Sequence, residues 1–171
     1  MSDDELVQKV CLGEKDAAEE LIKRYYPSIL RYCRWHCKSP QEAEDLTQET
    51  FFRLFKSLKK YDGKKKFKAY LYTIANHLCI DQSRKARWDF LEEESLVQEC
   101  EDILGVEHRE EIYSLLKVIS PEQREAVLLR YGEELSFSEI AKVTGCNLRT
   151  VQSRVRSALK IMRREQREHE G

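Results

Sequence analysis

Apolar residues recur every three or four positions along most of this 171-residue chain. This spacing places them on one side of an α-helix. No part of the sequence is predicted to form a β-strand, and only 3 Pro and 6 Gly interrupt the pattern. Helices are predicted over residues 3–12, 16–37, 39–60, 67–84, 107–118 and 120–132. The pattern therefore predicts an all-α fold.

Two of these helices begin with the dipeptide Ser-Pro. Ser39 and Ser120 are suited to accept hydrogen bonds from the open amides of the first turn, where proline is also well tolerated. Glu42 and Gln123 follow at capping-box spacing. By contrast, Pro27 falls inside the second predicted helix and is expected to kink or split it.

Residues 136–162 predict two further helices joined by a tight turn. Ser136 and Glu139 have capping-box spacing at the first helix start. Gly145 supplies the left-handed backbone that a sharp turn needs, and Asn147 can cap the second helix. The second helix carries an apolar face at helical spacing, which comprises Val151, Val155, Ala158, Leu159 and Met162.

Polar residues gather near the start of that second helix and lie off its apolar face. They are Arg149, Thr150, Gln152, Ser153 and Arg156. A short helix, a glycine turn and a longer helix with base-reading side chains at its start are typical of a DNA-binding helix-turn-helix. Arginine favours guanine and glutamine favours adenine, because each can form two hydrogen bonds to one base. An ordinary helical hairpin is the alternative for this stretch.

The charges of the chain are segregated along its length. Hydrophobic residues make up 41%, sufficient for a core, while charged residues make up 36% and the net charge is −1. Between Asp89 and Glu107 there are eight acidic residues and no Lys or Arg, so the remainder of the chain is basic. We therefore expect two small helical domains, residues 1–87 and 107–171, joined by a flexible acidic linker at residues 88–106.

No apolar run approaches the ~20 residues of a membrane span, and the N-terminus lacks a signal-peptide pattern. We therefore expect no membrane insertion and a cytoplasmic location. Cys33, His36 and Cys37 lie together on a predicted helix, where a metal or redox site is conceivable. Because a fourth ligand is not evident, the cysteines are interpreted as small buried residues. No metal or other cofactor is predicted.

A second group of residues suits single-stranded nucleic acid. Residues 61–66 form a basic loop led by a tyrosine, and polar and aromatic residues follow on the next helix. Aromatic rings can stack on bases while lysines neutralise phosphates. Tyr72 is expected to pack in the core instead. The candidate residues for nucleic acid are Tyr61, Lys64, Lys65, Lys66, Tyr70, Asn76 and His77.

These motifs resemble those of bacterial RNA polymerase sigma factors of the extracytoplasmic-function (ECF) class. Two sets of motifs, one for the second sigma domain and one for the fourth, occur in the family's order. The matching stretches are residues 44–51, 61–62 and 67–76 for the second domain, and residues 135–141 and 150–154 for the fourth. The short linker and the missing third domain are typical of the ECF class. The resemblance covers about residues 17–164.

The resemblance implies a transcription initiation factor that directs core RNA polymerase to promoters and is not an enzyme. It implies that Asp45, Gln48 and Glu49 bind the clamp coiled coil of the largest polymerase subunit. Their i, i+3 and i+4 spacing puts the three side chains on one helix face. The class also implies an anti-sigma factor as a partner.

The resemblance further implies that residues 61–66 capture a flipped base of the single-stranded −10 element. Tyr61 would form the aromatic wall of that pocket, and His77 would contact a base. The basic residues that would hold phosphates are Lys64, Lys65, Lys66, Arg84 and Lys85.

The polar start of the last helix is implied to enter the double-stranded −35 element through its major groove. Arg154 is expected to brace the domain or to meet a phosphate. The family often has arginine where this chain has Ser157 and Leu159, so we expect a phosphate contact to be lost there.

Two other functions can be built on the same residues. A one-component helix-turn-helix regulator would need a ligand-binding or dimerisation domain at the N-terminus, where Asp45 to His77 instead describe a surface for polymerase and DNA. An enzyme or a metal-dependent redox sensor would rest on Cys33, His36 and Cys37.

Overall fold

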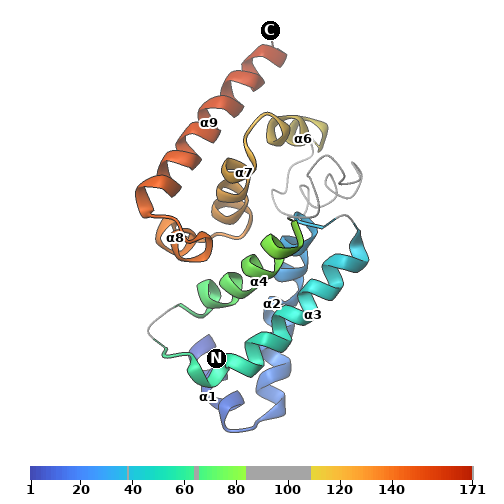
Figure 1. The fold of residues 1–171 in the computed structure, drawn as a ribbon, viewed down its shortest axis with the longest axis vertical. Helices are drawn as coiled ribbons and strands as arrows, with labels where there is room; N and C mark the ends of the chain where they lie inside the picture. Colours follow the sequence, from blue (N-terminus) through green and yellow to red (C-terminus); the bar gives the residue numbers. More distant parts are fainter. Residues whose placement is uncertain (38, 64–65, 84–108, 171) are drawn as a thin grey trace. The chain divides into compact units, whose positions relative to one another are not determined.

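The chain folds into helices only, over all the residues described here. The computed structural model describes residues 1–37, 39–63, 66–83 and 109–170 (Figure 1). Every regular element in these ranges is helical, so the all-α prediction is confirmed. No helix within them is long and apolar enough to cross a membrane. Two compact units are present, Met1–Arg87 and Trp88–Gly171.

Some of the predicted features lie outside the described residues. These are the acidic linker at residues 88–106 and the candidate phosphate-binding residues Lys64, Lys65, Arg84 and Lys85.

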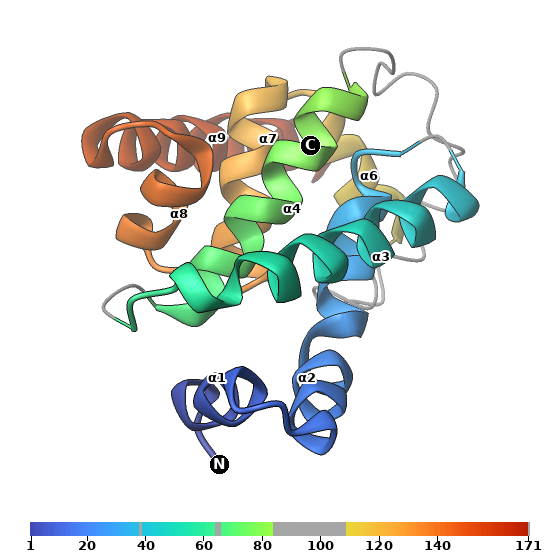
Figure 2. The same cartoon turned by 60° about the horizontal axis from the view of Figure 1, so that its bottom comes forward.

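The first unit is a bundle in which α2 packs against three other helices. Helix α2 contacts α1, α3 and α4, and α3 also contacts α4 (Figure 2). The elements are α1 (Asp3–Cys11), α2 (Lys15–Arg34), α3 (Pro40–Ser57), the 3-10 helix η1 (Leu58–Lys60) and α4 (Phe67–Ser83). Their positions agree with the helices that the apolar period predicts.

Side-chain caps fix where two of these helices begin. Ser2 Oγ accepts from the Glu5 amide at 3.2 Å, and the Ser2 amide donates to Glu5 Oε2 at 3.0 Å, which completes a capping box on α1. Ser39 Oγ accepts from the Glu42 amide at 3.2 Å at the start of α3, with Pro40 in the first turn. This cap of α3 agrees with the Ser-Pro prediction.

Pro27 lies inside α2 but does not split it. The helix runs from Lys15 to Arg34 as one element. Leu21 and Ile29, one on either side of the proline, are both fully buried, whereas Pro27 itself is exposed. Burial of the apolar face on both sides therefore offsets the loss of one backbone hydrogen bond.

Large aromatic side chains fill the core of the first unit. Tyr32, Trp35 and Tyr72 are all buried, and the rings of Tyr32 and Tyr72 meet edge to face with centroids 5.4 Å apart. This geometry is favourable for aromatic pairs. The prediction that Tyr72 packs in the core is confirmed.

The second unit is organised around its last helix. Helix α9 contacts α6, α7 and α8. The elements are α6 (Arg109–Lys117), α7 (Pro121–Val127), the π-helical segment η3 (Leu128–Gly132), α8 (Phe137–Thr144) and α9 (Leu148–Glu170). At the start of α7, Ser120 and Gln123 form the predicted capping box, with backbone-to-side-chain distances of 2.9 and 3.1 Å.

A buried arginine closes the turn between α6 and α7. Arg124 is only 6% exposed; its Nε donates to the Leu116 carbonyl at 2.9 Å and its Nη2 to the Ile119 carbonyl at 3.2 Å. Carbonyl groups at the C-terminus of a helix have no donor within the helix, and the Arg124 guanidinium provides the missing donors for this turn.

The π-helical segment continues α7 with wider hydrogen-bonded turns. The Glu133 amide donates to the Leu128 carbonyl at 3.0 Å, and the Leu135 amide donates to the Leu129 carbonyl at 3.0 Å. Glu134 follows in the left-handed region with φ of 59°. The chain then enters α8.

Candidate functional site

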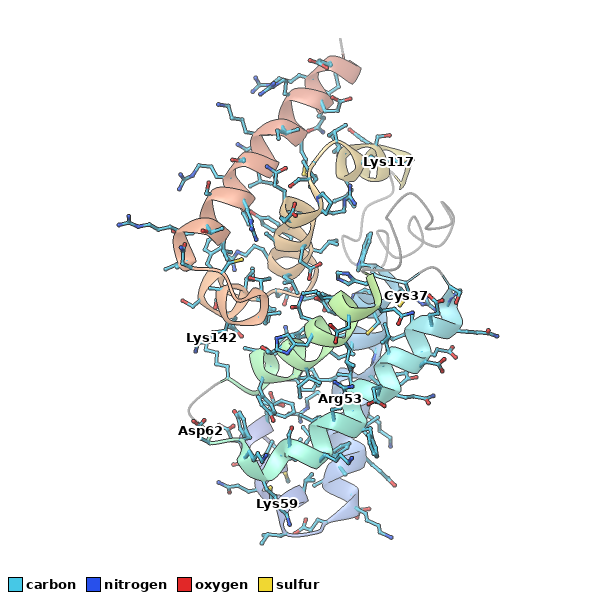
Figure 3. The ribbon with its side chains drawn as sticks, viewed as in Figure 1. Cys37, Arg53, Lys59, Asp62, Lys117 and Lys142 are labelled. Carbon is cyan, nitrogen blue, oxygen red and sulfur yellow. The ribbon has the colours of Figure 1, made fainter. Side chains whose placement is uncertain are left out.

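One face of α3 is polar, exposed and free of core packing. Asp45 and Gln48 are exposed, and Glu49 Oε1 accepts from Arg53 Nε at 3.0 Å (Arg53 is labelled in Figure 3). The opposite face of the helix is buried, with Ala43 and Leu54 fully inside the core. The structure therefore brings the three predicted polymerase-binding residues onto one accessible surface.

The same face also carries an exposed phenylalanine that sequence reasoning missed. Phe52 is 55% exposed, and Lys56 Nζ lies 4.7 Å from the centre of its ring. Phe52 is seven residues after Asp45 and four after Gln48, so the helical period alone could have placed it there. An exposed aromatic side chain within a polar face is typical of a protein-binding surface.

The loop before α4 holds a cluster of aromatic rings. The Tyr61 ring lies 5.2 Å from that of Tyr70 and 6.0 Å from that of Phe67, measured between centroids. The Tyr70 hydroxyl lies 2.5 Å from Ser57 Oγ. Tyr61 and Tyr70 are both half-buried, so each ring keeps an accessible part. The two candidate aromatics are therefore brought together.

The Tyr61 hydroxyl is held by a carboxylate from the N-terminal helix. It donates to Asp4 Oδ1 at 3.2 Å. Burial, together with the negative charge of Asp4, raises the pKa of Tyr61 to about 12. The phenol is therefore a neutral hydrogen-bond donor near pH 7.

Other candidate −10 residues divide between surface and core. Lys66 and His77 are exposed, the first just before α4 and the second on it. Asn76 is only 2% exposed, and its Nδ2 donates to the Tyr32 hydroxyl at 2.9 Å. This placement contradicts the expectation that Asn76 contacts nucleic acid, because its amide is engaged inside the bundle.

The turn before α9 has the geometry that its sequence predicts. Ser136 and Glu139 form a capping box on α8 with distances of 3.1 Å each. Gly145 adopts φ of +71° with nothing within 4 Å of the position of a Cβ. Asn147 Oδ1 accepts from the Thr150 amide at 2.8 Å, which caps α9.

The start of α9 presents its polar residues away from the core. Arg149, Ser153 and Arg156 are exposed, while Thr150 and Gln152 are half-buried. On the opposite side, the buried residues of the helix are Val151, Val155 and Ala158. All five candidate −35 residues therefore lie on the first three turns of one helix.

Arg154 is half-buried and contacts the turn of the helix-turn-helix. Its Nη1 donates to Cys146 Sγ at 3.1 Å, and Cys146 is the residue after the turn glycine. This contact supports the bracing role expected for Arg154 and ties α9 to the turn.

The C-terminal half of α9 is strongly basic. Arg156, Lys160, Arg163, Arg164 and Arg167 line a common open hollow of about 420 Å³. Sequence reasoning singled out only Arg156 among them. Continuing the helical period past Arg156 would have found the rest, because each step is three or four residues.

The cysteines of the first unit are core residues. Cys33 and Cys79 are fully buried with their sulfur atoms 3.8 Å apart, and Cys37 is 3% exposed (Cys37 is labelled in Figure 3). The hydrogen bond from Cys79 lowers the pKa of Cys33, whereas burial raises the pKa of Cys37 to about 12. Among the residues that the structure describes, no group of three His, Cys, Asp or Glu side chains could hold a metal ion.

Comparison with known families gives two matches in the chain. Residues 21–89 match Sigma-70 region 2, and residues 109–162 match Sigma-70, region 4. The chain is 30% identical to the RNA polymerase sigma factor YlaC of Bacillus subtilis (strain 168), covering 93% of this chain and 99% of the relative. It is also 30% identical to the ECF RNA polymerase sigma factor SigC of Mycobacterium tuberculosis (strain CDC 1551 / Oshkosh), covering 92% of this chain and 89% of the relative.

Two solved structures have a similar fold. CnrH, solved in complex with the cytosolic domain of CnrY, has a TM-score of 0.74, with 20% identity and 97% of each chain covered. The sigma factor RpoE of Bartonella quintana, solved with the anti-sigma factor NepR, has a TM-score of 0.64, with 22% identity, covering 85% of this chain and 94% of that chain. At these identities the likeness concerns the fold.

Proposed function

Since this chain belongs to the ECF class of RNA polymerase sigma factors and is a transcription initiation factor, we propose that its surfaces divide between core polymerase and the promoter. The first unit would bind polymerase and the −10 element, and the second unit would bind the −35 element. The order of the two matching regions supports this division. A one-component regulator is disfavoured, because both units are accounted for by sigma regions.

The exposed face of α3 is proposed to bind the clamp coiled coil of the largest polymerase subunit. The observation that carries this proposal is that Asp45, Gln48 and Glu49 share an accessible face with Phe52. The polar residues would set orientation, and the phenyl ring would supply apolar burial at the centre. Interfaces draw most of their affinity from a few such aromatic anchors.

The aromatic cluster before α4 is proposed to capture a base of the opened −10 strand. A base would stack on the accessible part of Tyr61 or Tyr70, and Lys66 and His77 lie close by in sequence and remain exposed. Lys64, Lys65, Arg84 and Lys85 are proposed as phosphate contacts from the sequence. Removing a base from the stack costs a few kcal/mol, which ring stacking can offset.

Helix α9 is proposed to read the −35 element. Recognition helices of this type contact base edges with their N-terminal residues, which here are Arg149, Thr150, Gln152, Ser153 and Arg156. The exposed Arg149 and Arg156 are the best candidates for guanine.

An anti-sigma factor is proposed as the regulatory partner. The similar structures of CnrH and RpoE were solved with CnrY and with NepR, respectively. We also propose that the protein catalyses no reaction of its own and acts in the cytoplasm, where the polymerase is.

Transcription in vitro tests this function directly. The purified chain and core polymerase are incubated with a library of DNA randomised over two promoter elements, and the transcribed templates are sequenced. Enrichment of one −35 and one −10 motif is the expected result. Specific binding to duplex DNA by the chain alone, with no transcription, would favour the one-component regulator instead.

A further inference from the structure

The basic residues in the C-terminal half of α9 continue the face that carries the proposed −35 readers. Positions 149, 153, 156, 160, 163, 164 and 167 are spaced by three or four residues, or fall side by side, so they form one stripe. Arg156 belongs to both sets, since it is a proposed reader and also lines the hollow with the other four basic residues. The basic side chains of the stripe therefore point in the same direction as the proposed −35 readers at the start of the helix.

The charge of this stripe is not balanced by acids on the helix. From Leu148 to Arg164 the helix contains no Asp or Glu; acids that share the face of the stripe enter only in the last turns, where Glu168 follows Arg164 by four residues and Glu170 follows Arg167 by three. Within the part of the chain that the structure describes, no ion pair joins an acid to any of the five side chains in the hollow. A solvated helix usually mixes charges at i and i+4. In this stripe the pairs at that spacing are Arg156 with Lys160, Lys160 with Arg164, and Arg163 with Arg167; these like charges repel unless an anionic partner is present.

We propose that Lys160, Arg163, Arg164 and Arg167 form a second DNA-binding surface, which contacts backbone phosphates independently of base sequence. This inference rests on the proposal that the start of α9 reads the −35 element. Arginine suits such a role because its guanidinium can donate two parallel hydrogen bonds to one phosphate.

Helix geometry places this surface outside the groove. A helix rises ~1.5 Å per residue, so Arg156 and Arg167 are about 16 Å apart along the axis. The major groove is only ~12 Å wide, and recognition helices insert their N-terminal end. The C-terminal half of α9 would then lie outside the groove, where the flanking strand carries one phosphate per ~3.4 Å of DNA axis.

The test measures salt-dependent binding of the assembled holoenzyme to promoter DNA. The variant Arg164→Ala/Arg167→Ala is compared with Lys15→Ala/Lys23→Ala, which removes the same charge from exposed positions of α2. We expect the α9 variant to bind about tenfold more weakly, with a log–log salt slope less steep by about 2, and the α2 variant to be unchanged. The loss should be equal on templates with the selected −35 motif and with a scrambled one. Restoring charge as Arg164→Lys/Arg167→Lys should recover the slope.

Each outcome distinguishes this inference from the function on which it rests. If wild-type holoenzyme does not discriminate the −35 motif, the assignment of α9 as the reader fails. If it discriminates but the α9 variant keeps the wild-type slope, the phosphate surface is overturned. An α9 variant that binds DNA normally but loses contact with an acidic protein of the transcription complex would assign the stripe to that partner instead.

Discussion

The hydroxyl of Tyr61 and the carboxylate of Asp4 are joined by a hydrogen bond of 3.2 Å, although 57 residues separate them in the sequence. Asp4 lies in the first turn of α1, and its neighbour Asp3 accepts hydrogen bonds from Arg24 and from Tyr25 on α2. Helix α1 is therefore fixed on α2 and in turn orients the ring proposed to receive a −10 base. Through this hydrogen bond the N-terminal helix would help to position the proposed −10 site.

The raised pKa of Tyr61 predicts a loss of stability at high pH. Because the folded protein holds this proton more tightly than the unfolded chain does, the stabilisation is fully present below pH ~10 and is lost as the pH rises toward about 12. Tyr61→Phe should remove this contribution. Denaturant unfolding of both proteins at pH 8, 10 and 11 gives the comparison. A difference between them that does not change with pH would contradict the assignment.

Phe52→Ala should weaken binding to core polymerase without harming the fold. The ring is 55% exposed, so its removal should change the unfolding midpoint little, whereas loss of an interface anchor typically costs about 1–2 kcal/mol, roughly five- to thirtyfold in affinity. Titration of labelled protein with core polymerase measures the effect. Gln48→Ala/Glu49→Ala should act in the same direction. Leu12→Ala, at an 80% exposed position on the end of α1, is the matched control.

Asn76 and His77 are adjacent residues with opposite expected phenotypes. Asn76→Ala should lower the free energy of unfolding by about 1–3 kcal/mol, because it removes a buried hydrogen bond to Tyr32. His77→Ala, at an exposed position, should leave stability intact and alter the −10 preference in library transcription. A folded Asn76→Ala protein of unchanged stability and altered −10 preference would restore Asn76 as a DNA contact.

Gly145→Ala should destabilise the second unit by about 1–2 kcal/mol, since an L-residue with a Cβ is strained in the left-handed conformation. The cost is conformational rather than steric, because nothing lies within 4 Å of the added atom. Gly145→Asn should recover part of the loss, because asparagine tolerates this conformation better. Thermal unfolding of the three proteins measures the order; equal midpoints for alanine and asparagine would contradict the explanation.

Arg149→Ala should cost about 1–3 kcal/mol at one or two −35 base pairs and little elsewhere. Binding of the holoenzyme to a panel of single-base −35 variants measures the cost per position. A loss that is uniform over the panel would identify Arg149 as a phosphate contact. In that case Gln152 would be the next residue to examine for base recognition.

Local features of the fold were accessible from the sequence, whereas contacts between distant residues were not. The capping boxes at Ser120 and Ser136 and the left-handed Gly145 follow from short-range rules, and the structure has all three. The burial of Asn76 depends on a tyrosine 44 residues away, which no local pattern indicates. The hydrogen bond from Tyr61 to Asp4 also joins residues far apart in the sequence, so no local pattern indicates it.

The exposed Phe52 on α3 and the basic stripe of α9 were not predicted from the sequence, although both depend on short-range helical spacing. Phe52 directly follows the buried Phe51, so its hydrophobicity alone does not show that it belongs to the exposed polar face. The basic stripe of α9 extends beyond the turns that a helix-turn-helix uses for base reading, so that motif indicates only Arg156 among the residues of the hollow. Both follow from helical spacing once the whole face is considered.

The π-helical segment from Leu128 to Gly132 has a consequence for how promoter preference can change. A π turn accommodates one more residue than an α turn, and one residue rotates a helix by about 100°. Deleting a residue here would restore regular α-helix and re-aim α8 and α9 relative to α7. A change of length at this bend would therefore alter the direction of the proposed recognition helix relative to α7 without replacing any side chain proposed to contact a base.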